Sequence, residues 1–281
     1  MINADFEDIT AMRILKAAGF WKRARREYYN IKVRCYNLAF PNLPASFSGK
    51  KILFIADLHY PGREGFHEKV LEMVKSLDFD YCFLGGDYAW GDGEFPVWVC
   101  RFMNSLLREI KSKTTVIHSI LGNHDSLFIS EHLGNAGACM LINSSAEIES
   151  EAGEKISVAG LGDHHKLRND DWDAMMSSLN HGTKFRILLC HNPNYYLRAQ
   201  QTNFSLMLAG HTHAGQFCLP SGIPVFTNCR APRRYARGQW KYKNLSGITT
   251  AGVGSSRLTA RLNCPGEISI ITLLKDKMGN G

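Results

Sequence analysis

The chain has 281 residues, of which 44% are hydrophobic and 21% are charged, and its formal net charge is +7 at pH 7. This is an ordinary globular composition, and the length suits one large α/β domain or two small ones. The positive charge favours anionic partners such as phosphates, nucleic acid or an acidic membrane surface, although a solvated basic surface explains it equally well.

Cysteine spacing and apolar runs exclude several classes of protein. The eight cysteines are scattered with no C-x-x-C pair, which excludes a zinc-finger spacing and a compact disulfide framework. No apolar run approaches the roughly 20 residues that a membrane-spanning helix needs. Arg13, Lys16 and Lys22 interrupt the apolar residues of the N-terminus, so a secretory signal is not expected. We therefore expect a cytoplasmic protein that is soluble or peripheral at the inner membrane.

Residues 1–40 differ from the rest, and we interpret them as an amphipathic basic extension of a domain that spans residues 41–281. Within residues 9–29, apolar residues recur close to helical spacing, and basic residues are interleaved with aromatic ones. Such a helix suits an anionic membrane surface. The alternative is a helix packed back on the domain with its charges in water.

The stretch from residue 33 to residue 120 predicts alternating strands and helices. Short apolar runs predict the strands, and apolar residues at helical spacing predict the helices. From residue 51 onward the order is β-α-β-α-β, which implies parallel strands joined by right-handed crossovers. The expected strands are residues 33–40, 51–56, 81–84 and 114–120, and the expected helices are residues 66–77 and 96–111.

After residue 138 the pattern changes to shorter elements. No internal repeat or interdomain linker is visible, so we expect one domain with an N-terminal extension. A helix is expected over residues 170–179. The strands are expected as a meander over residues 139–142, 146–151 and 156–159, followed by residues 185–190, 206–209, 248–253 and 267–274.

Polar residues follow five of the expected strands at the point where each apolar run ends. In open α/β sheets such positions hold ligands, and alternation along an extended chain sends residues two apart to the same side. Glycine comes immediately before the polar residue in three of these segments, which allows a sharp turn or a close approach to an ion. The polar residues are Asp57 and His59, Asp87, Asn123 and His124, His191, and His211 and His213.

This set contains Asp, Asn and His but no Cys. Such donors suit Zn, Mn or Fe better than they suit a thiolate structural site or a Ca²⁺ cage. The set is too large for one tetrahedral ion. Two ions roughly 3.5–4 Å apart, bridged by a carboxylate, form the arrangement that holds phosphoryl oxygens and generates a hydroxide nucleophile near neutral pH.

The motifs at these positions are D-x-H, G-G-D, G-N-H-D, an isolated H and G-H-T-H, and they resemble those of the calcineurin-like metallophosphoesterase superfamily. The resemblance covers residues 50–274. It implies an α/β fold in which two sheets form a β-sandwich flanked by helices. Residues 53–60, 210–216, 252–255 and 261–264 are similar to the bacterial YaeI/YkuE-type phosphodiesterase branch, which is related to the UDP-2,3-diacylglucosamine pyrophosphatase of lipid A synthesis.

The resemblance also implies two divalent transition metal ions, Mn, Zn or Fe, as cofactors. The first ion would be held by Asp57, His59 and His213. The second would be held by Asn123, His191 and His211, with Asp87 bridging the two. A metal-free scaffold with the same fold is the non-enzyme alternative.

The resemblance implies catalytic roles for two further residues. His124 would stand off the metals and donate to the leaving group or to the charge of the transition state. Asp125 would orient the imidazole of His124, as carboxylates outside a metal's ligand set do.

The implied reaction is hydrolysis of a phosphodiester or diphosphate bond by metal-activated hydroxide. The sharp candidate among nucleotide-diphospho-lipid substrates is UDP-2,3-diacylglucosamine, which would give lipid X and UMP in lipid A synthesis. The alternatives are a general phosphodiesterase on soluble esters or nucleotides, and a nuclease. A nuclease would show a long basic track with stacking aromatics, whereas basic residues here concentrate at the N-terminus and at residues 230–243. Nucleic acid is therefore not the expected partner, and no obligate protein partner is inferred.

Three further features are each open between a site role and a plain one. The loop 160–165, with His164 and His165, suits a substrate loop or a plain polar loop, and the plain loop is favoured. Gln216 follows the metal histidines closely enough to point at the site. Arginine forks suit diphosphates, and a diphosphate site or a solvated face is expected at Arg230, Arg233, Arg234 and Arg237.

Overall fold

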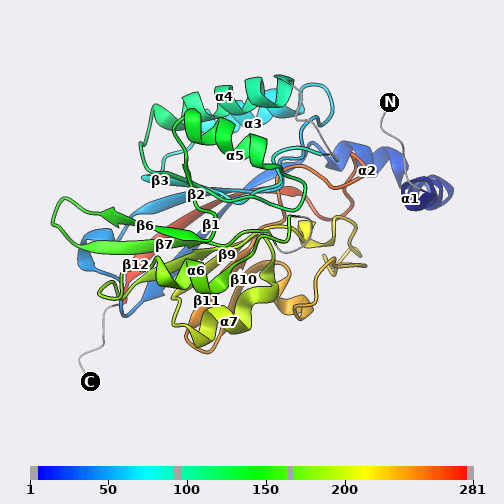
Figure 1. The fold of residues 1–281 in the computed structure, drawn as a ribbon. Coiled ribbons are helices and arrows are strands. Elements are labelled where there is room, and N and C mark those ends of the chain that lie inside the picture. The colour runs from blue at the N-terminus through cyan, green and yellow to red at the C-terminus, as the bar shows by residue number, and fades with distance from the viewer. Residues whose placement is uncertain (1–5, 91–96, 164–166, 277–281) are drawn as a thin grey trace.

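The computed structural model describes residues 6–90, 97–163 and 167–276, which form two six-stranded sheets flanked by helices (Figure 1). The α/β sandwich implied by the resemblance is confirmed. Sheet one has the strand order β1 (Ile31–Phe40), β12 (Gly266–Lys275), β2 (Lys51–Ile55), β3 (Tyr81–Leu84), β4 (Ile117–Ser119) and β5 (Cys139–Met140). Sheet two has the order β10 (Gly238–Tyr242), β11 (Leu245–Thr249), β9 (Leu206–Ala209), β8 (Arg186–Leu189), β7 (Lys155–Gly160) and β6 (Ser144–Glu149).

The central strands of both sheets are parallel. In sheet one, β2, β3 and β4 pair in parallel, as the predicted β-α-β-α-β order requires. In sheet two, β7, β8, β9 and β11 also pair in parallel. The strands β2, β3, β4, β8 and β9 each run toward a polar segment, so the carboxyl ends of these strands position the site.

The two sheets pack face to face because their strands are apolar on both sides. In β2, Phe54 contributes to the core between the sheets, while its neighbour Leu53 contributes to the core under the helices. In β9, Leu208 contributes to the core between the sheets, and Met207 contributes to the core on the opposite face. Strict alternation along each strand therefore builds a core on both faces of each sheet.

Helices cover the outer face of each sheet. Residues of α3 (Phe66–Ser76), α4 (Val97–Lys111) and α5 (Leu127–Asn135) form one core with sheet one. Residues of α6 (Trp172–Ser177) and α7 (Tyr196–Gln201) form another with sheet two. Figure 1 shows these two helical layers on opposite sides of the sheets. Short 3₁₀ helices occur at η1 (Ala45–Phe47), η2 (Pro193–Tyr195), η3 (His213–Gly215) and η4 (Arg233–Tyr235).

The expected meander at residues 139–159 is wrong as a single unit. β5 pairs in parallel with β4 in sheet one, whereas β6 and β7 form an antiparallel hairpin in sheet two. The short connection between β5 and β6 therefore passes from one sheet to the other. The elements α5, α7 and β10 were not predicted, and the helix expected to begin at Pro96 is described only from Val97.

The N-terminal segment consists of α1 (Phe6–Ala17), α2 (Trp21–Glu27) and β1. β1 lies within the stretch expected to be an extension, but all ten of its residues pair in parallel with β12. Leu15 and Trp21 pack with Phe217 and Leu258 around buried Ala24, so the helices contact the domain as well as carrying exposed charges. No helix in the described part of the chain is both long and apolar enough to cross a bilayer.

Candidate metal centre

The polar residues expected to form a metal site lie at one edge of the sandwich, where strands from both sheets end. Asp57 and Asp87 follow β2 and β3 of sheet one, and His191 follows β8 of sheet two. The loops after β2 and β3 run side by side, because the amide of Asp57 donates to the carbonyl of Gly86 over 2.9 Å. The amide of His59 donates to the carbonyl of Asp87 over 3.0 Å. The parallel pairing of the strands thus continues into the site.

Asp57, His59 and His213 form the first group of buried side chains that could hold a metal ion. The Nε2 atoms of His59 and His213 lie 3.0 Å apart. Asp57 Oδ1 lies 3.6 Å from Nε2 of His213 and 4.0 Å from Nε2 of His59. These are the three residues that the resemblance implies for the first ion.

Asp57, Asp87 and His191 form a second group that overlaps the first. Asp87 Oδ2 lies 3.2 Å from Nε2 of His191 and 3.6 Å from Nε2 of His59, so this carboxylate reaches both groups. The Nδ1 atom of His191 lies 2.7 Å from the carbonyl oxygen of Gly85 and donates to it, which leaves Nε2 as the atom that faces the carboxylates. Metal-ligating histidines are typically oriented in this way.

Asn123 and His211, the other two predicted ligands, contact each other beside His191. Asn123 Oδ1 lies 2.6 Å from Nδ1 of His211. Nε2 of His211 lies 2.9 Å from the carbonyl oxygen of Asn228, to which it can only donate. In the neutral ring, Nδ1 then presents its lone pair on the same side as the amide oxygen of Asn123. The rings of His191 and His211 meet edge to face with centroids 5.3 Å apart.

His124 lies beside the first group and not within it. Its backbone amide donates to Asp87 Oδ1 over 2.8 Å. Its ring lies 4.4 Å from the ring of Trp90 and 5.3 Å from the ring of His59, measured between centroids. The position fits the expectation of a histidine that stands off the metals.

Asp125 is buried, and its hydrogen bonds lead to backbone rather than to the ring of His124 that it was expected to orient. Oδ2 accepts from the amides of Asp87 and Gly122 over 2.7 and 2.8 Å, and Oδ1 accepts from the amide of Tyr88 over 2.9 Å. Asp125 therefore ties the loop after β3 to the loop after β4.

The backbone of the site is held in a conformation that side chains disfavour. Positive φ values for residues with a Cβ are uncommon and cost roughly 1–3 kcal/mol each when the surrounding structure enforces them. Such strain clusters at functional sites. Five of the seven predicted ligands have positive φ, namely Asp57 (54°), His59 (46°), Asp87 (57°), His211 (69°) and His213 (49°).

Two glycines of the motifs allow the carboxylates to be this close to the backbone. A Cβ on Gly210 would lie 2.5 Å from Asp57 Oδ2, and a Cβ on Gly122 would lie 2.3 Å from Asp87 Oδ1. Both contacts are far shorter than atoms tolerate. The glycines therefore leave space for the carboxylates where any side chain would displace them.

Burial sets the protonation of the first group. It raises the pKa of Asp57 to about 7, and it lowers the pKa of His59 to about 3. Burial, with the neighbouring His59 and Arg261, holds the pKa of His213 well below its usual range. Both rings are therefore neutral near pH 7, which is the form that binds a metal ion.

His191 differs from the other rings. Burial alone would lower its pKa, but the carboxylates of Asp87 and Asp57 outweigh burial and raise the pKa to about 10. Without a metal ion, His191 thus holds a proton between the two carboxylates. Buried carboxylates require a compensating positive charge, and a divalent ion in the same place supplies more of it than one proton does.

The described residues therefore fit two divalent ions. Two overlapping groups of ring nitrogens and buried carboxylate oxygens converge, and the carboxylates beside His191 raise its pKa to about 10, as they would favour any cation placed there. The donor set of nitrogen and oxygen atoms without thiolate suits Mn, Zn or Fe. All seven residues expected as ligands are brought together, while their individual roles remain predictions.

Sequence reasoning missed two residues that shape the site. Arg261 is fully buried and donates from Nε to the carbonyl of Gly254 over 2.8 Å and from Nη2 to that of Ala251 over 2.8 Å. It thereby holds the loop whose Gly254 amide donates to the carbonyl of Asp57 over 2.7 Å. The other is Trp90, against which the His124 ring packs. An arginine five residues before the nearest strand carries no pattern that signals burial.

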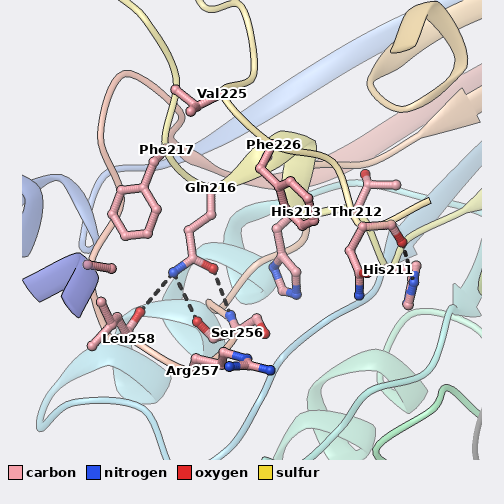
Figure 2. A pocket seen from close by; sticks show the side chains of 13 residues that line it. His211, Thr212, His213, Gln216, Phe217, Val225, Phe226, Ser256, Arg257 and Leu258 are labelled. Carbon is pink, nitrogen blue, oxygen red and sulfur yellow. Dashed lines mark hydrogen bonds between the residues drawn. The ribbon is translucent and has the colours of Figure 1, made fainter. Parts of the chain in front are cut away.

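Gln216 does not point at the metal residues. Its Nε2 donates to the carbonyls of Ser256 and Leu258, each over 2.9 Å, and its Oε1 accepts from the amide of Ser256 over 2.9 Å (Figure 2). Nε2 also donates to the carbonyl of Ala260 over 3.1 Å. Gln216 therefore holds the segment 256–260 beside the site. His164 and His165 lie outside the described residues.

One cavity adjoins the centre, and a second is lined in part by the segment that follows His191. The first, of about 430 Å³, places His211 and His213 in one lining with the apolar side chains of Val225, Phe226 and Leu258 (Figure 2). Ala11 of α1 contributes to the same lining.

The second cavity has a volume of about 870 Å³, and its lining includes Asn194, three residues after His191. Three arginines, Arg168, Arg198 and Arg230, line it together with Tyr195 and Tyr196. Asn194 Oδ1 accepts from the backbone amide of Arg230 over 2.8 Å, which fixes this wall next to the His191 segment. Of the four arginines singled out in the sequence, Arg230 thus lines a cavity, whereas Arg237 donates to the carbonyl of Gly222.

Comparisons with known proteins agree with this geometry. A family model described as calcineurin-like phosphoesterase matches residues 50–215, which contain all seven residues of the centre. The chain is 28% identical over 268 residues to the uncharacterized metallophosphoesterase YkuE of Bacillus subtilis, covering 92% of this chain and 91% of that protein. It is 29% identical over 233 residues to the phosphodiesterase YaeI of Escherichia coli, covering 80% and 82%. It is also 26% identical over 223 residues to the uncharacterized metallophosphoesterase YkoQ of Bacillus subtilis, covering 76% and 80%.

Proposed function

The chain belongs to the calcineurin-like phosphoesterase family and is a phosphoester hydrolase, and we propose that it cleaves a phosphodiester or diphosphate bond in an amphiphilic, lipid-like substrate. One observation carries this proposal: the cavity beside the centre is lined by the predicted ligands His211 and His213 together with apolar side chains. A phosphate at the centre would thus have an apolar chain as its immediate neighbour.

The ions would be held by Asp57, His59 and His213 on one side and by Asn123, His191 and His211 on the other, with Asp87 between them. Two divalent ions held by these residues would polarise the phosphoryl oxygens and lower the pKa of a bound water molecule, which would supply the nucleophile. Members of the family use two such ions, and the overlapping groups around Asp57 match that requirement.

The protein's own residues perform the remaining steps. His124, whose backbone amide donates a hydrogen bond to Asp87 and whose ring packs on Trp90, would donate a proton to the leaving-group oxygen. Burial around His59 excludes bulk water, so charges that develop there interact more strongly than in water. Asp125 fixes the distance between the loops that carry Asp87 and Asn123.

The specific substrate that we propose is UDP-2,3-diacylglucosamine, which the protein would cleave to UMP and lipid X as a step of lipid A synthesis. Its acyl chains would enter the cavity that contains Phe226, and its nucleotide would lie against the cavity lined by Arg168, Arg198 and Arg230. Within the described residues neither Arg168 nor Arg230 forms a salt bridge, so both guanidinium groups can bind phosphate.

The test is incubation of the purified protein with UDP-2,3-diacylglucosamine in Mn²⁺, Zn²⁺ or Fe²⁺, with UMP and lipid X measured by mass spectrometry. The soluble diester bis(p-nitrophenyl) phosphate is the reference substrate. We expect turnover of the lipid, and we expect Phe226→Ala to lower the ratio of kcat/KM for the lipid to that for the soluble diester. Turnover of the soluble diester or of nucleotides without turnover of the lipid would reject the lipid substrate and leave a general phosphodiesterase.

A further inference from the structure

The large exposed apolar side chains are concentrated in a few parts of the chain. Isolated exposed apolar residues are normal, whereas a contiguous group indicates a binding surface. Ten of the twelve large apolar side chains that are exposed in the described part of the chain come from three segments. These are Ile14 and Phe20 in the α1–α2 segment, Val97, Trp98, Leu127 and Phe128 at the starts of α4 and α5, and Leu219, Ile223, Val225 and Phe226 after η3.

Topology places these segments around one opening. α4 and α5 each follow a parallel strand of sheet one, so their first turns lie at the carboxyl edge of that sheet, as the metal residues do. The loop 217–226 begins four residues after His213, and Val225 and Phe226 line the cavity beside it. The same cavity includes Ala11 of α1. We call this set of ten exposed side chains the apolar rim.

The loop that carries four members of the rim is a defined structure. The amide of Leu219 donates to the carbonyl of Ile223 over 2.9 Å, and that of Gly222 donates to the carbonyl of Leu219 over 2.8 Å. Arg237 donates to the carbonyl of Gly222. Phe226 is 69% exposed and Val225 is 60% exposed, although the backbone around them is hydrogen-bonded. The loop therefore presents apolar side chains to solvent from a backbone that is already ordered. Binding to a surface would cost this backbone little further conformational entropy.

The charge next to the rim is positive. Lys16, Lys22 and Arg26 are exposed on α1 and α2, and within the described residues none of them forms a salt bridge. Arg25 packs over the ring of Trp21 at 5.8 Å and is likewise not in a salt bridge. Exposed apolar side chains beside unpaired basic ones are the composition that binds the interface of an anionic bilayer.

We infer that the apolar rim and the basic faces of α1 and α2 form a membrane-docking surface, which places the opening of the metal centre against an anionic bilayer. The inference extends the proposed function, because an amphiphilic substrate resides in the bilayer and would reach the cavity lined by Phe226 without crossing water. It adds the rim residues to the 9–29 segment, for which the sequence left an anionic surface and packing against the domain as alternatives.

Vesicle binding tests the surface without any turnover. The full chain is sedimented with phosphatidylcholine vesicles, with and without phosphatidylglycerol, at low and high salt. We expect binding only with the anionic lipid and weaker binding at high salt. The variant Leu219→Asp/Ile223→Asp, at the loop tip and outside the cavity lining, should bind at least about tenfold more weakly, because two apolar side chains no longer enter the interface.

The matched control is Ala152→Asp/His181→Asp, which also adds two acidic residues at exposed positions. These positions lie beside the β6–β7 hairpin and β8, at the end of the molecule opposite α1 (Figure 1). It should bind vesicles as the unaltered protein does. Both variants should retain turnover of bis(p-nitrophenyl) phosphate, which shows that they fold.

Three results would overturn the inference. The unaltered protein could fail to bind anionic vesicles, or the control could weaken binding as much as the loop variant does. Light scattering could instead show a dimer that the loop variant converts to a monomer, with no vesicle binding, which would assign the rim to a second copy of the chain. Vesicle binding without turnover of the lipid would reject the proposed substrate and leave the docking surface intact.

Discussion

The Nε2 atoms of His59 and His213 lie 3.0 Å apart, although the two residues are separated by 154 positions in the chain. They come from opposite sheets of the sandwich, and both lie within 4.0 Å of Asp57 Oδ1. Burial keeps both rings neutral. Two neutral ring nitrogens that converge on a buried carboxylate form a site for a cation, and the two sheets must dock correctly for that site to exist.

Asp87→Asn is expected to remove metal and activity together. The amide keeps an acceptor for the His124 backbone but loses the negative charge that faces His59 and His191. We expect metal content, measured by plasma mass spectrometry, to fall with turnover, the latter by more than about 100-fold. Asp78→Asn, the same change at an exposed carboxylate paired with Lys51, is the control and should alter neither. Full metal content in Asp87→Asn would contradict a bridging role.

His124→Ala separates catalysis from metal binding. The ring lies beside His59 and Trp90 and is not part of either metal-binding group. We expect unchanged metal content and a fall in kcat of roughly 10²- to 10⁴-fold, the range typical of a lost general acid. The loss should be smaller for diesters with good leaving groups, which need no proton. Normal turnover on a poor leaving group would exclude the proposed role.

Gly210→Ala tests the space that the backbone leaves for Asp57. The new Cβ would lie 2.5 Å from Asp57 Oδ2 and 2.9 Å from the Cβ of Ala56, so the carboxylate must move. We expect weaker metal binding and loss of turnover, measured on the same preparation. Gly134→Ala, where the nearest atom to the new Cβ is 3.9 Å away, is the control and should be active. An active Gly210→Ala protein with both metals would show that the close packing is unnecessary.

Much of the centre could be predicted because its signals are local. An apolar run that ends in Asp57-Leu58-His59 indicates a strand end, and the same pattern recurs at Asp87, at Asn123, at His191 and at His211. Each motif spans only a few consecutive residues, so it can be recognised without knowledge of the fold. The parallel order of β2, β3 and β4 follows from the helices between them.

The remaining features depend on contacts that no local pattern encodes. The pairing of β1 with β12 joins Ile31 to Gly266, and no periodicity in either strand specifies the other. α5 escaped prediction because Leu127 and Phe128, in its first turn, face solvent and blur the helical spacing of its apolar residues. Asp125 was interpreted through its neighbour His124, but three backbone amides from two loops determine its role.

The stability of the metal-free protein should fall as pH rises from about 7 to about 10. The folded-state pKa of His191 is about 10, above its unfolded value of about 6.5. Its stabilising contribution is therefore fully present below about pH 6.5 and is lost as pH rises through about 10. The raised pKa values of Asp57 and Asp125 also make stability fall with rising pH.

Thermal unfolding of metal-stripped protein across this range measures the effect. The metal-loaded protein should show a weaker dependence, because the ion replaces the proton on His191. His191→Gln should flatten the dependence in the metal-free state. A Tm that rises between pH 7 and pH 10 in the stripped protein would contradict the protonated state of His191.

The two-metal centre can be tested by titrating the metal-stripped protein with Mn²⁺. Binding is followed by calorimetry, and turnover of bis(p-nitrophenyl) phosphate is measured at each step. We expect two ions bound per chain, proton release on binding, and turnover that appears only as the second site fills. Binding of fewer than one ion per chain, or turnover that persists in the stripped protein, would contradict a two-metal centre built from these strand ends.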